Sequence, residues 1–456
     1  MGQSSARPWV FAAQAFLIPA LLVAGSGQSP WVQLLCVGVS AGVGSALLLW
    51  LWREPAFEAT PLAFILLLAL LLRGSALLAA PLLEDDYFRY LWDGYQTVTT
   101  GNPYRQAPAD FFLNRDLAPA WQAVLSGINY PDIPTIYGPV LQLLFAVAYG
   151  LAPGELWAVK CLLLLADMAT LLVLARSGVK MRWLLAYAVH PLLLKEVITS
   201  AHPDGLVGLF LLLAVLSWRR RWPYLVGASL ALAVATKVAA MVALPLLILF
   251  PPAVRVVCHL GPSWRSGWRW AWRVGLAFGA GLLCLYLPFL LQGSSDWLAL
   301  RKFGDEWRFN PLMFRLVEVL LPSAWVRPVS GGLVVVGVAA LAWWWRRPPG
   351  GRGFFPTWPA LQNSQALPPI AGALTLLLLW SPVVNPWYWL WALAPAVLLG
   401  NGIVPAVASV AWVSYLISYH VWGLVAPHSI LPWAVALTQG LVVLGVAVLR
   451  PANPAT

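Results

Sequence analysis

Charged residues are scarce in this chain: they make up 10% of its 456 residues, against about 25% in an ordinary soluble domain. Apolar residues make up 61%, and the mean hydropathy is +0.76. This composition excludes both a soluble globular protein and a disordered chain. Apolar runs of membrane-spanning length recur from end to end, so we expect a polytopic membrane protein.

Cysteine and the common catalytic motifs are also rare or missing. Three of the four cysteines lie in apolar runs and none forms a metal-type pair with another, which predicts packed free thiols. The sequence has no P-loop, no GxGxxG after a soluble strand, no HExxH and no Gly-x-Ser-x-Gly elbow. Cytoplasmic nucleotide chemistry and a zinc motif therefore have no support in the sequence. No cleavable signal peptide is expected either, because the first apolar run lacks a basic leader beyond Arg7.

The apolar runs predict an all-α integral membrane protein, a polytopic bundle of about 12–14 spans. Several of the runs are shorter than the roughly 20 residues that a straight span needs. The predicted spans lie near 9–25, 31–52, 61–82, 154–175, 182–200, 204–218, 223–237, 238–252, 270–291, 329–345, 366–382, 387–400, 403–424 and 429–449.

The net charge of +11 is explained by topology and not by nucleic-acid binding. Basic residues gather in loops that would all be cytoplasmic if 138–151 does not span, and only two acids, Glu54 and Glu58, share that side. The segment 138–151 would be roughly 21 Å long as a helix, too short for a core of about 30 Å. We therefore expect it to lie along the outer surface as an interfacial helix. The basic groups are Arg219–Arg221, Arg265/Arg269/Arg273, Arg346/Arg347/Arg352 and Arg176/Lys180/Arg182.

This topology places both termini in the cytoplasm and creates two large outer loops, 83–153 and 292–328, the first carrying interfacial helices. The cytoplasmic stretch 346–365, rich in Pro, Gly and Arg, is interpreted as a linker. The chain is then divided into two N-terminal spans (1–60), a catalytic module (61–260) and the C-terminal spans (261–456).

Acidic and aromatic residues open the first outer loop. Glu84, Asp85 and Asp86 directly follow an apolar span, and Asp86, Tyr90 and Asp93 are spaced to share one helix face. Three adjacent acids at a membrane face are costly unless they are solvated, paired or used. A solvated helix cap with interfacial aromatics explains this segment as well as a catalytic site does.

Other polar residues are expected at the same outer level. His202 and Asp204 lie between two spans, Lys195 and Glu196 lie in the outer third of a span, and Lys237 interrupts an apolar stretch. An ionisable residue within a membrane indicates function by default, with intramolecular pairing as the alternative. That alternative stays open for Lys195, Glu196 and Arg73. Lys237 would suit a phosphate as a point charge.

Two further segments combine polar and aromatic side chains. Residues 301–310 carry mixed charge beside aromatics, which fits recognition of an anionic headgroup or a sugar and equally an ordinary wet loop. In 381–391, Asn385, Trp387 and Tyr388 are expected at the outer surface. Trp and Tyr rings stack on sugars, and they also form the usual interfacial belt.

Taken in order, these motifs resemble the GT-C superfamily of polyprenyl-phosphate-sugar-dependent glycosyltransferases, in particular its bacterial mannosyltransferase-like members. The resemblance covers roughly residues 61–400. Its most specific part is the first loop, Asp85-Asp86-x-x-Arg89-Tyr90-x-Trp92-Asp93-Gly94 followed by Gly101-Asn102-Pro103-Tyr104. It continues through Asn129-Tyr130-Pro131, Tyr137-Gly138-Pro139, His202-Pro203-Asp204-Gly205, Thr236-Lys237, Trp307-Arg308-Phe309-Asn310 and Pro386-Trp387-Tyr388.

The resemblance implies inverting transfer of a sugar, such as mannose, from a polyprenyl-phosphate donor to a lipid or glycan acceptor. It implies that Asp86, or its rival Asp85, is the general base. Residues expected to contact the donor phosphate or sugar are Lys237, His202, Asp204, Arg308 and Arg89. Residues expected to line the substrates are Tyr90, Asp93, Tyr137, Trp307, Asn385, Trp387 and Tyr388. Asn385 stands where relatives often carry His.

The resemblance also implies a bacterial inner-membrane protein whose active site is extracytoplasmic. Its partners would be the lipid-linked donor, the acceptor and membrane lipids, with no nucleic acid. It leaves the use of a divalent metal open, and the sequence assigns no metal ligands. The alternative function is a flippase for lipid-linked glycans or a secondary transporter. That alternative predicts charges along a path through the membrane, whereas the intramembrane charges here cluster in the outer half and no internal repeat is visible.

Overall fold

The structure, a computed structural model, describes residues 2–252, 264–311, 313–345 and 367–417. These residues form helices and contain no strand; a single isolated bridge joins Phe309 to Val383. The predicted all-α fold is confirmed. The first half contains α1 (Gly2–Ala15), α2 (Leu17–Gly25), α3 (Pro30–Arg53), η1 (Pro55–Ala59), α4 (Leu62–Leu77), α5 (Tyr87–Thr100), η2 (Pro108–Phe111), α6 (Pro119–Ser126), α7 (Pro139–Leu151), α8 (Leu156–Arg176), α9 (Met181–Ala188), η3 (Leu193–Thr199), α10 (Gly205–Arg219) and α11 (Pro223–Thr236). The second half contains η4 (Val238–Ala243), α12 (Leu244–Ile248), α13 (Trp264–Leu290), α14 (Trp297–Glu306), α15 (Met313–Leu320), α16 (Ser323–Trp345), α18 (Ile370–Trp380), η5 (Pro386–Trp389), α19 (Leu390–Leu398), α20 (Ile403–Val410) and η6 (Ala411–Ile417).

Helices of membrane-spanning length and composition run through the described parts of the chain. Five are long and apolar enough to cross a membrane: Arg7–Gly25, Pro30–Arg53, Leu156–Arg176, Ser266–Leu290 and Ser323–Trp345. Shorter apolar helices account for most of the other predicted spans. The chain is therefore a multi-pass helical membrane protein.

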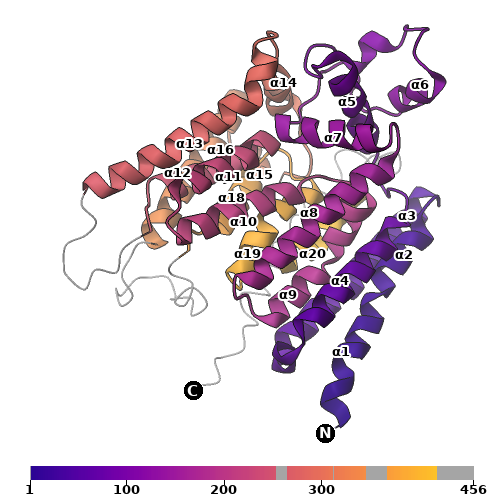
Figure 1. The fold of residues 1–456 in the computed structure, drawn as a ribbon, viewed down its shortest axis with the longest axis vertical. Coiled ribbons are helices and arrows are strands. Elements are labelled where there is room, and N and C mark those ends of the chain that lie inside the picture. Colours follow the sequence, from indigo (N-terminus) through magenta and orange to yellow (C-terminus); the bar gives the residue numbers. More distant parts are fainter. Residues whose placement is uncertain (1, 253–263, 312, 346–366, 418–456) are drawn as a thin grey trace.

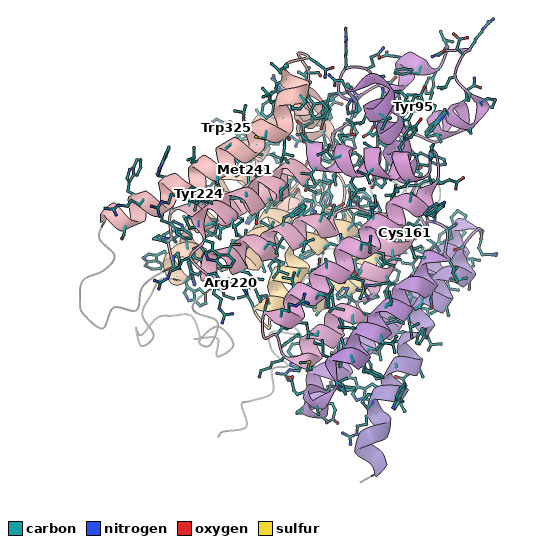
Figure 2. All side chains as sticks on the ribbon, viewed as in Figure 1. Tyr95, Cys161, Arg220, Tyr224, Met241 and Trp325 are labelled. Carbon is teal, nitrogen blue, oxygen red and sulfur yellow. The ribbon has the colours of Figure 1, made fainter. Side chains whose placement is uncertain are left out.

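The long helices form a bundle, and the first large loop covers one of its ends. In Figure 1, α5, α6, α7 and α14 gather at the end opposite the start of α1. Tyr95 on α5 and Arg220, just after α10, lie at opposite ends of the bundle in Figure 2. The basic triplet Arg219–Arg221 is thus separated by the length of α10 from Asp204, which immediately precedes that helix.

The outer faces of the bundle helices carry the apolar side chains that a lipid environment favours. Leu165 on α8 is 64% exposed and Val335 on α16 is 69% exposed. Trp325 and Tyr224 likewise lie on the outside of the bundle (Figure 2). In water such a surface would be unstable, whereas lipid tails solvate it.

Two predicted spans are interrupted, each for a local reason. The span expected at 182–200 is α9 followed by the π-helical η3, because Pro191 has no backbone N–H and restricts the residue before it. The break expected at Lys237 is confirmed: α11 ends at Thr236, and Lys237 is extended with φ −145° and ψ 125°. Both interruptions occur in elements that lead to the cavity described below.

The segment expected to be an interfacial helix is α7. Leu141, Phe145 and Ala148 on one face are buried, while Leu143 and Val147 on the other are 53% exposed. Close packing fixes this helix, because a Cβ on Gly138 would lie 2.1 Å from the carbonyl oxygen of Ala235 on α11. Only glycine allows the start of α7 to lie directly against α11.

Arg73 is a partner in a buried ion pair. Its Nε donates to Asp167 Oδ2, its Nη1 donates to the carbonyl oxygen of Ala188 at 2.8 Å, and Tyr187 donates to the other oxygen of Asp167 at 2.7 Å. Arg73 is therefore paired within the protein, as the alternative to a functional role predicted, and its contacts connect α4 to α8 and α9.

Several predictions fall outside the described residues. They are the span at 429–449, the end of the span at 403–424, the linker 346–365 and the basic residues Arg346, Arg347 and Arg352.

Candidate active site

A cavity of about 530 Å³ opens where the first loop meets the later segments. Its walls come from five parts of the chain that are distant in sequence: 84–89, 129–137, Lys237, 302–309 and 383–388. Nine predicted site residues line it together: Asp86, Arg89, Tyr137, Lys237, Trp307, Arg308, Asn385, Trp387 and Tyr388.

Asp86 stands at the start of α5 and faces this cavity. Its side chain is 29% exposed, and Tyr137 donates a hydrogen bond to its Oδ2 at 3.4 Å. A helix N-terminus favours a negative charge. Burial opposes ionisation of Asp86, but contacts with His202 and the charge of Lys237 outweigh burial and lower its pKa. Asp86 is therefore an ionised carboxylate near neutral pH, as a proton acceptor must be.

His202 lies directly behind Asp86 and is fully buried. Its Nδ1 is 3.0 Å from Glu196 Oε2, and its Nε2 is 3.6 Å from Asp86 Oδ2. The ring stacks on Trp387 with centroids 3.8 Å apart and planes at 12°. Burial alone would lower the pKa of His202, but the two carboxylates raise it to about 9. The imidazole thus fixes the position of Asp86 from the side away from the cavity.

Lys237 supplies the main candidate cation for a phosphate. Its Nζ lies 4.6 Å from the ring centroid of Tyr137 and 5.9 Å from that of Tyr388. Among the described residues it forms no ion pair with a carboxylate. Its ammonium therefore lies at the cavity between two aromatic rings, available for an anionic ligand.

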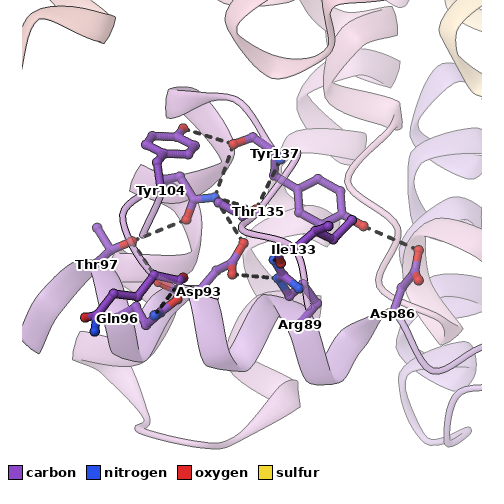
Figure 3. A network of polar contacts seen from close by, with 11 residues as sticks. Asp86, Arg89, Asp93, Gln96, Thr97, Tyr104, Ile133, Thr135 and Tyr137 are labelled. Carbon is purple, nitrogen blue, oxygen red and sulfur yellow. Dashed lines mark hydrogen bonds and ion pairs between the residues drawn. The ribbon is translucent and has the colours of Figure 1, made fainter. Parts of the chain in front are cut away.

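A polar network behind the cavity holds α5 against the loop that carries Tyr137 (Figure 3). Asp93 is fully buried; it accepts hydrogen bonds from Arg89 at 3.1 Å and from Gln142 at 3.0 Å. Arg89 also donates to the carbonyl oxygen of Ile133 at 2.8 Å. Asp93 was expected to line the substrate, but the structure places it behind the wall, where it positions Arg89.

The second predicted outer loop closes the opposite wall. Phe309 accepts a hydrogen bond from the backbone N–H of Val384 at 2.8 Å and donates one to Pro382 at 3.0 Å. This pairing fixes Arg308 and Trp307 beside 383–388. Arg308 forms an ion pair with Glu318 at 2.8 Å and is 53% exposed. It lines the cavity with part of its charge already neutralised.

Besides Asp93, four more predicted residues lie outside the cavity wall. Tyr90 is buried and stacks on Phe145. Asp204 is buried and accepts a hydrogen bond from Trp391 at 2.6 Å. Asp85 accepts a hydrogen bond from Asn129. His202, as described above, reaches the cavity through Asp86.

Backbone strain concentrates around the site. Five non-glycine residues of the described chain have positive φ, and four of them lie at or beside the cavity: Leu83, Tyr130, Ala201 and Asn310. Such conformations cost of order 1–3 kcal/mol each and persist where surrounding structure enforces them. Leu83 and Ala201 immediately precede Glu84 and His202, so they set the direction in which these side chains enter the cluster.

Three residues absent from the predicted site lie at the cavity or directly behind it. Glu84 lines the cavity, and Glu196 and Tyr415 lie behind His202. Lys195 forms an ion pair with Glu196 at 3.0 Å, so the pairing alternative holds for both. Glu84 could have been found from its place in the acidic run, but nothing in the sequence near Tyr415 connects it with Glu196.

The fold and the cavity together define a class, a helical membrane protein whose cavity is lined by both a carboxylate, Asp86, and a lysine, Lys237. A family model described as alpha-(1→6)-mannopyranosyltransferase, N-terminal domain, of the MptA_B family, matches residues 8–253, more than half of the chain. The chain belongs to this family and is a membrane glycosyltransferase of the mannosyltransferase type. Comparisons with curated proteins and with solved structures give no match.

Proposed function

We propose that the protein transfers mannose, or another hexose, from a polyprenyl-phosphate donor to a lipid or glycan acceptor, with inversion at the anomeric carbon. The observation that carries this proposal is that the carboxylate of Asp86 and the ammonium of Lys237 line the same cavity, and that Lys237 has no ion-pair partner among the residues that the structure describes. A hydroxyl acceptor needs a base, and a phosphate leaving group needs a cation.

In this reaction the acceptor hydroxyl gives its proton to Asp86, and its oxygen attacks the anomeric carbon from the face opposite the phosphate. The bond between the anomeric carbon and the phosphate oxygen breaks, and the electron pair leaves with the polyprenyl phosphate. The phosphate gains one negative charge as it leaves, so Lys237 interacts with it most strongly in the transition state. Trp307, Trp387 and Tyr388 provide ring faces for the sugar.

We place the site at the extracytoplasmic face of the membrane, in a bacterial inner membrane. The charge pattern supports this proposal, because the basic triplet Arg219–Arg221 lies at the end of α10 opposite the cavity. The exposed leucine and valine side chains of α7 suit a helix that lies on lipid. A donor carried by a lipid would reach such a cavity from within the membrane plane.

The test is reconstitution of the purified chain in liposomes with a radiolabelled hexose on polyprenyl phosphate. We expect label in a glycosylated acceptor, with the anomeric configuration opposite to that of the donor when the product is analysed by NMR. A sugar nucleotide should give no product. Transfer from the sugar nucleotide alone, or retention of configuration, would contradict the proposed donor or mechanism respectively.

A further inference from the structure

Two carboxylates and one imidazole converge at the wall of the cavity. Ligand atoms of Glu84, Asp86 and His202 all lie within 4.8 Å of one another. Glu84 and Asp86 line the cavity, and His202 closes the cluster from behind. We propose that these three residues form a binding site for one divalent cation of the Zn²⁺ or Mn²⁺ type.

The buried imidazole supplies an observation independent of the acidic residues. His202 is fully buried, and its Nε2 lies 3.6 Å from Asp86 Oδ2, too far for a hydrogen bond, with no other hydrogen-bond partner among the described residues. An unpaired polar atom in the protein interior is costly. This nitrogen faces Asp86, and the ligand atoms of Glu84, Asp86 and His202 lie within 4.8 Å of one another, so a metal ion between them would complete its coordination.

The other ring nitrogen is held as it is in metal sites. Nδ1 of His202 is 3.0 Å from Glu196 Oε2, and because a carboxylate only accepts, Nδ1 carries the proton. Lys195 at 3.0 Å and the hydroxyl of Tyr415 at 2.8 Å orient Glu196 in turn. Metal-binding histidines commonly donate their second N–H to such a carboxylate, which fixes the ring and strengthens the ligand.

The ligand set indicates which cation fits and what it does. One imidazole with two carboxylates suits Zn²⁺ or Mn²⁺ better than Mg²⁺ or Ca²⁺, which prefer oxygen ligands alone. Three protein ligands leave coordination positions for substrate, as in catalytic metal sites. At this wall the ion would lie beside the cavity and neutralise charge there. That role rests on the proposed function, whereas the binding itself does not.

The experiment measures binding without any sugar substrate. The full chain is purified in detergent, stripped with EDTA and titrated with Mn²⁺ under electron paramagnetic resonance, then with Zn²⁺ in competition. We expect one ion per chain, and at least a 100-fold loss of affinity in Glu84→Gln and in His202→Gln. Glu196→Gln should weaken binding about 10–100-fold, as loss of such an orienting carboxylate usually does.

The matched control is Asp116→Asn, a carboxylate-to-amide change at an exposed position of the same loop. Each variant is checked for folding by size exclusion and by its melting temperature. Binding that is absent in the folded wild type, or equal in the control and in both ligand variants, overturns the metal site. If sugar transfer persists after EDTA and no metal ion binds, the metal site is refuted and the proposed transferase function stands. If the metal ion binds but no sugar is transferred, the metal site stands and the proposed transferase function is refuted.

Discussion

Replacing Lys237 by methionine should slow sugar transfer strongly while leaving the fold intact. The ammonium lies at the cavity, 4.6 Å from the Tyr137 ring, and forms no ion pair with another described residue. Methionine keeps the length and the apolar stem and removes only the charge. A hydrogen bond to a charged group contributes about 1.5–3 kcal/mol. At 1.36 kcal/mol per factor of ten, the loss is roughly 10–150-fold.

The effect should appear in kcat rather than in KM. The donor phosphodiester carries one negative charge and the departing phosphate carries a second, so Lys237 stabilises the transition state more than the bound donor. Lys237→Arg should retain more activity than Lys237→Met, because the charge stays.

The assay is steady-state transfer of radiolabelled hexose from polyprenyl phosphate, with Lys180→Met as the matched control. Lys180 is exposed at the start of α9, away from the cavity-lining residues. If kcat of Lys237→Met stays within twofold of the wild type, or if Lys180→Met falls equally, the phosphate role of Lys237 is refuted.

Three further predictions concern neighbouring features. Trp387→Ala should lower kcat/KM about 2–10-fold, because it removes a ring stack with His202 that contributes roughly 0.5–1.5 kcal/mol. Trp387→Phe should retain most of the wild-type kcat/KM. Equal kinetics of the two variants would contradict the role of this stack, whose centroids are 3.8 Å apart. Gly138→Ala should lower the melting temperature, because the new Cβ would collide with Ala235 and overpacking costs about 1–3 kcal/mol. Gly42→Ala should leave the melting temperature unchanged, because the space around Gly42 is open. Equal melting temperatures of the two variants would refute the close approach of Gly138 to Ala235. Burial raises the pKa of Asp296 to about 6 in the folded protein, from 3.8 when it is unperturbed. The folded state therefore binds more protons between these values, and this residue's contribution to stability falls as pH rises from 4 to 6. Asp296→Asn should remove that slope from melting temperatures measured across this range, and an unchanged slope would contradict the burial argument.

Most of the membrane architecture could be predicted from the sequence. Apolar length and basic loops are local signals, so they predicted the long spans and the short helix now seen as α7. The break at Lys237 was visible because a charge interrupts an apolar run. The π-helical turn after Pro191 was not predicted, since proline interrupts the regular pattern without specifying which irregular geometry replaces it.

The sequence predicted which residues lie at the site better than it predicted how they are arranged. The order of motifs predicted that Asp86, Lys237 and Trp387 belong together, and they share one cavity. The sequence could not show that Asp93 points away from that cavity. Helix spacing predicts which residues share a face of the helix, but it does not predict what that face packs against. The contact of Glu196 with Tyr415 joins residues 219 positions apart. Nothing in the sequence around Glu196 or around Tyr415 indicates that the two residues are in contact.

The measurement that tests the central claim most directly is transfer from labelled polyprenyl-phosphate-mannose by the wild type, Asp86→Asn and Asp85→Asn. Asparagine preserves the shape of the side chain and removes its ability to accept the proton. We expect the transfer rate of Asp86→Asn to be at least 100-fold below that of the wild type, with a melting temperature near that of the wild type. Asp85→Asn should stay active. Near-wild-type transfer by Asp86→Asn would contradict the account, and loss of transfer only in Asp85→Asn would move the base to the neighbouring carboxylate.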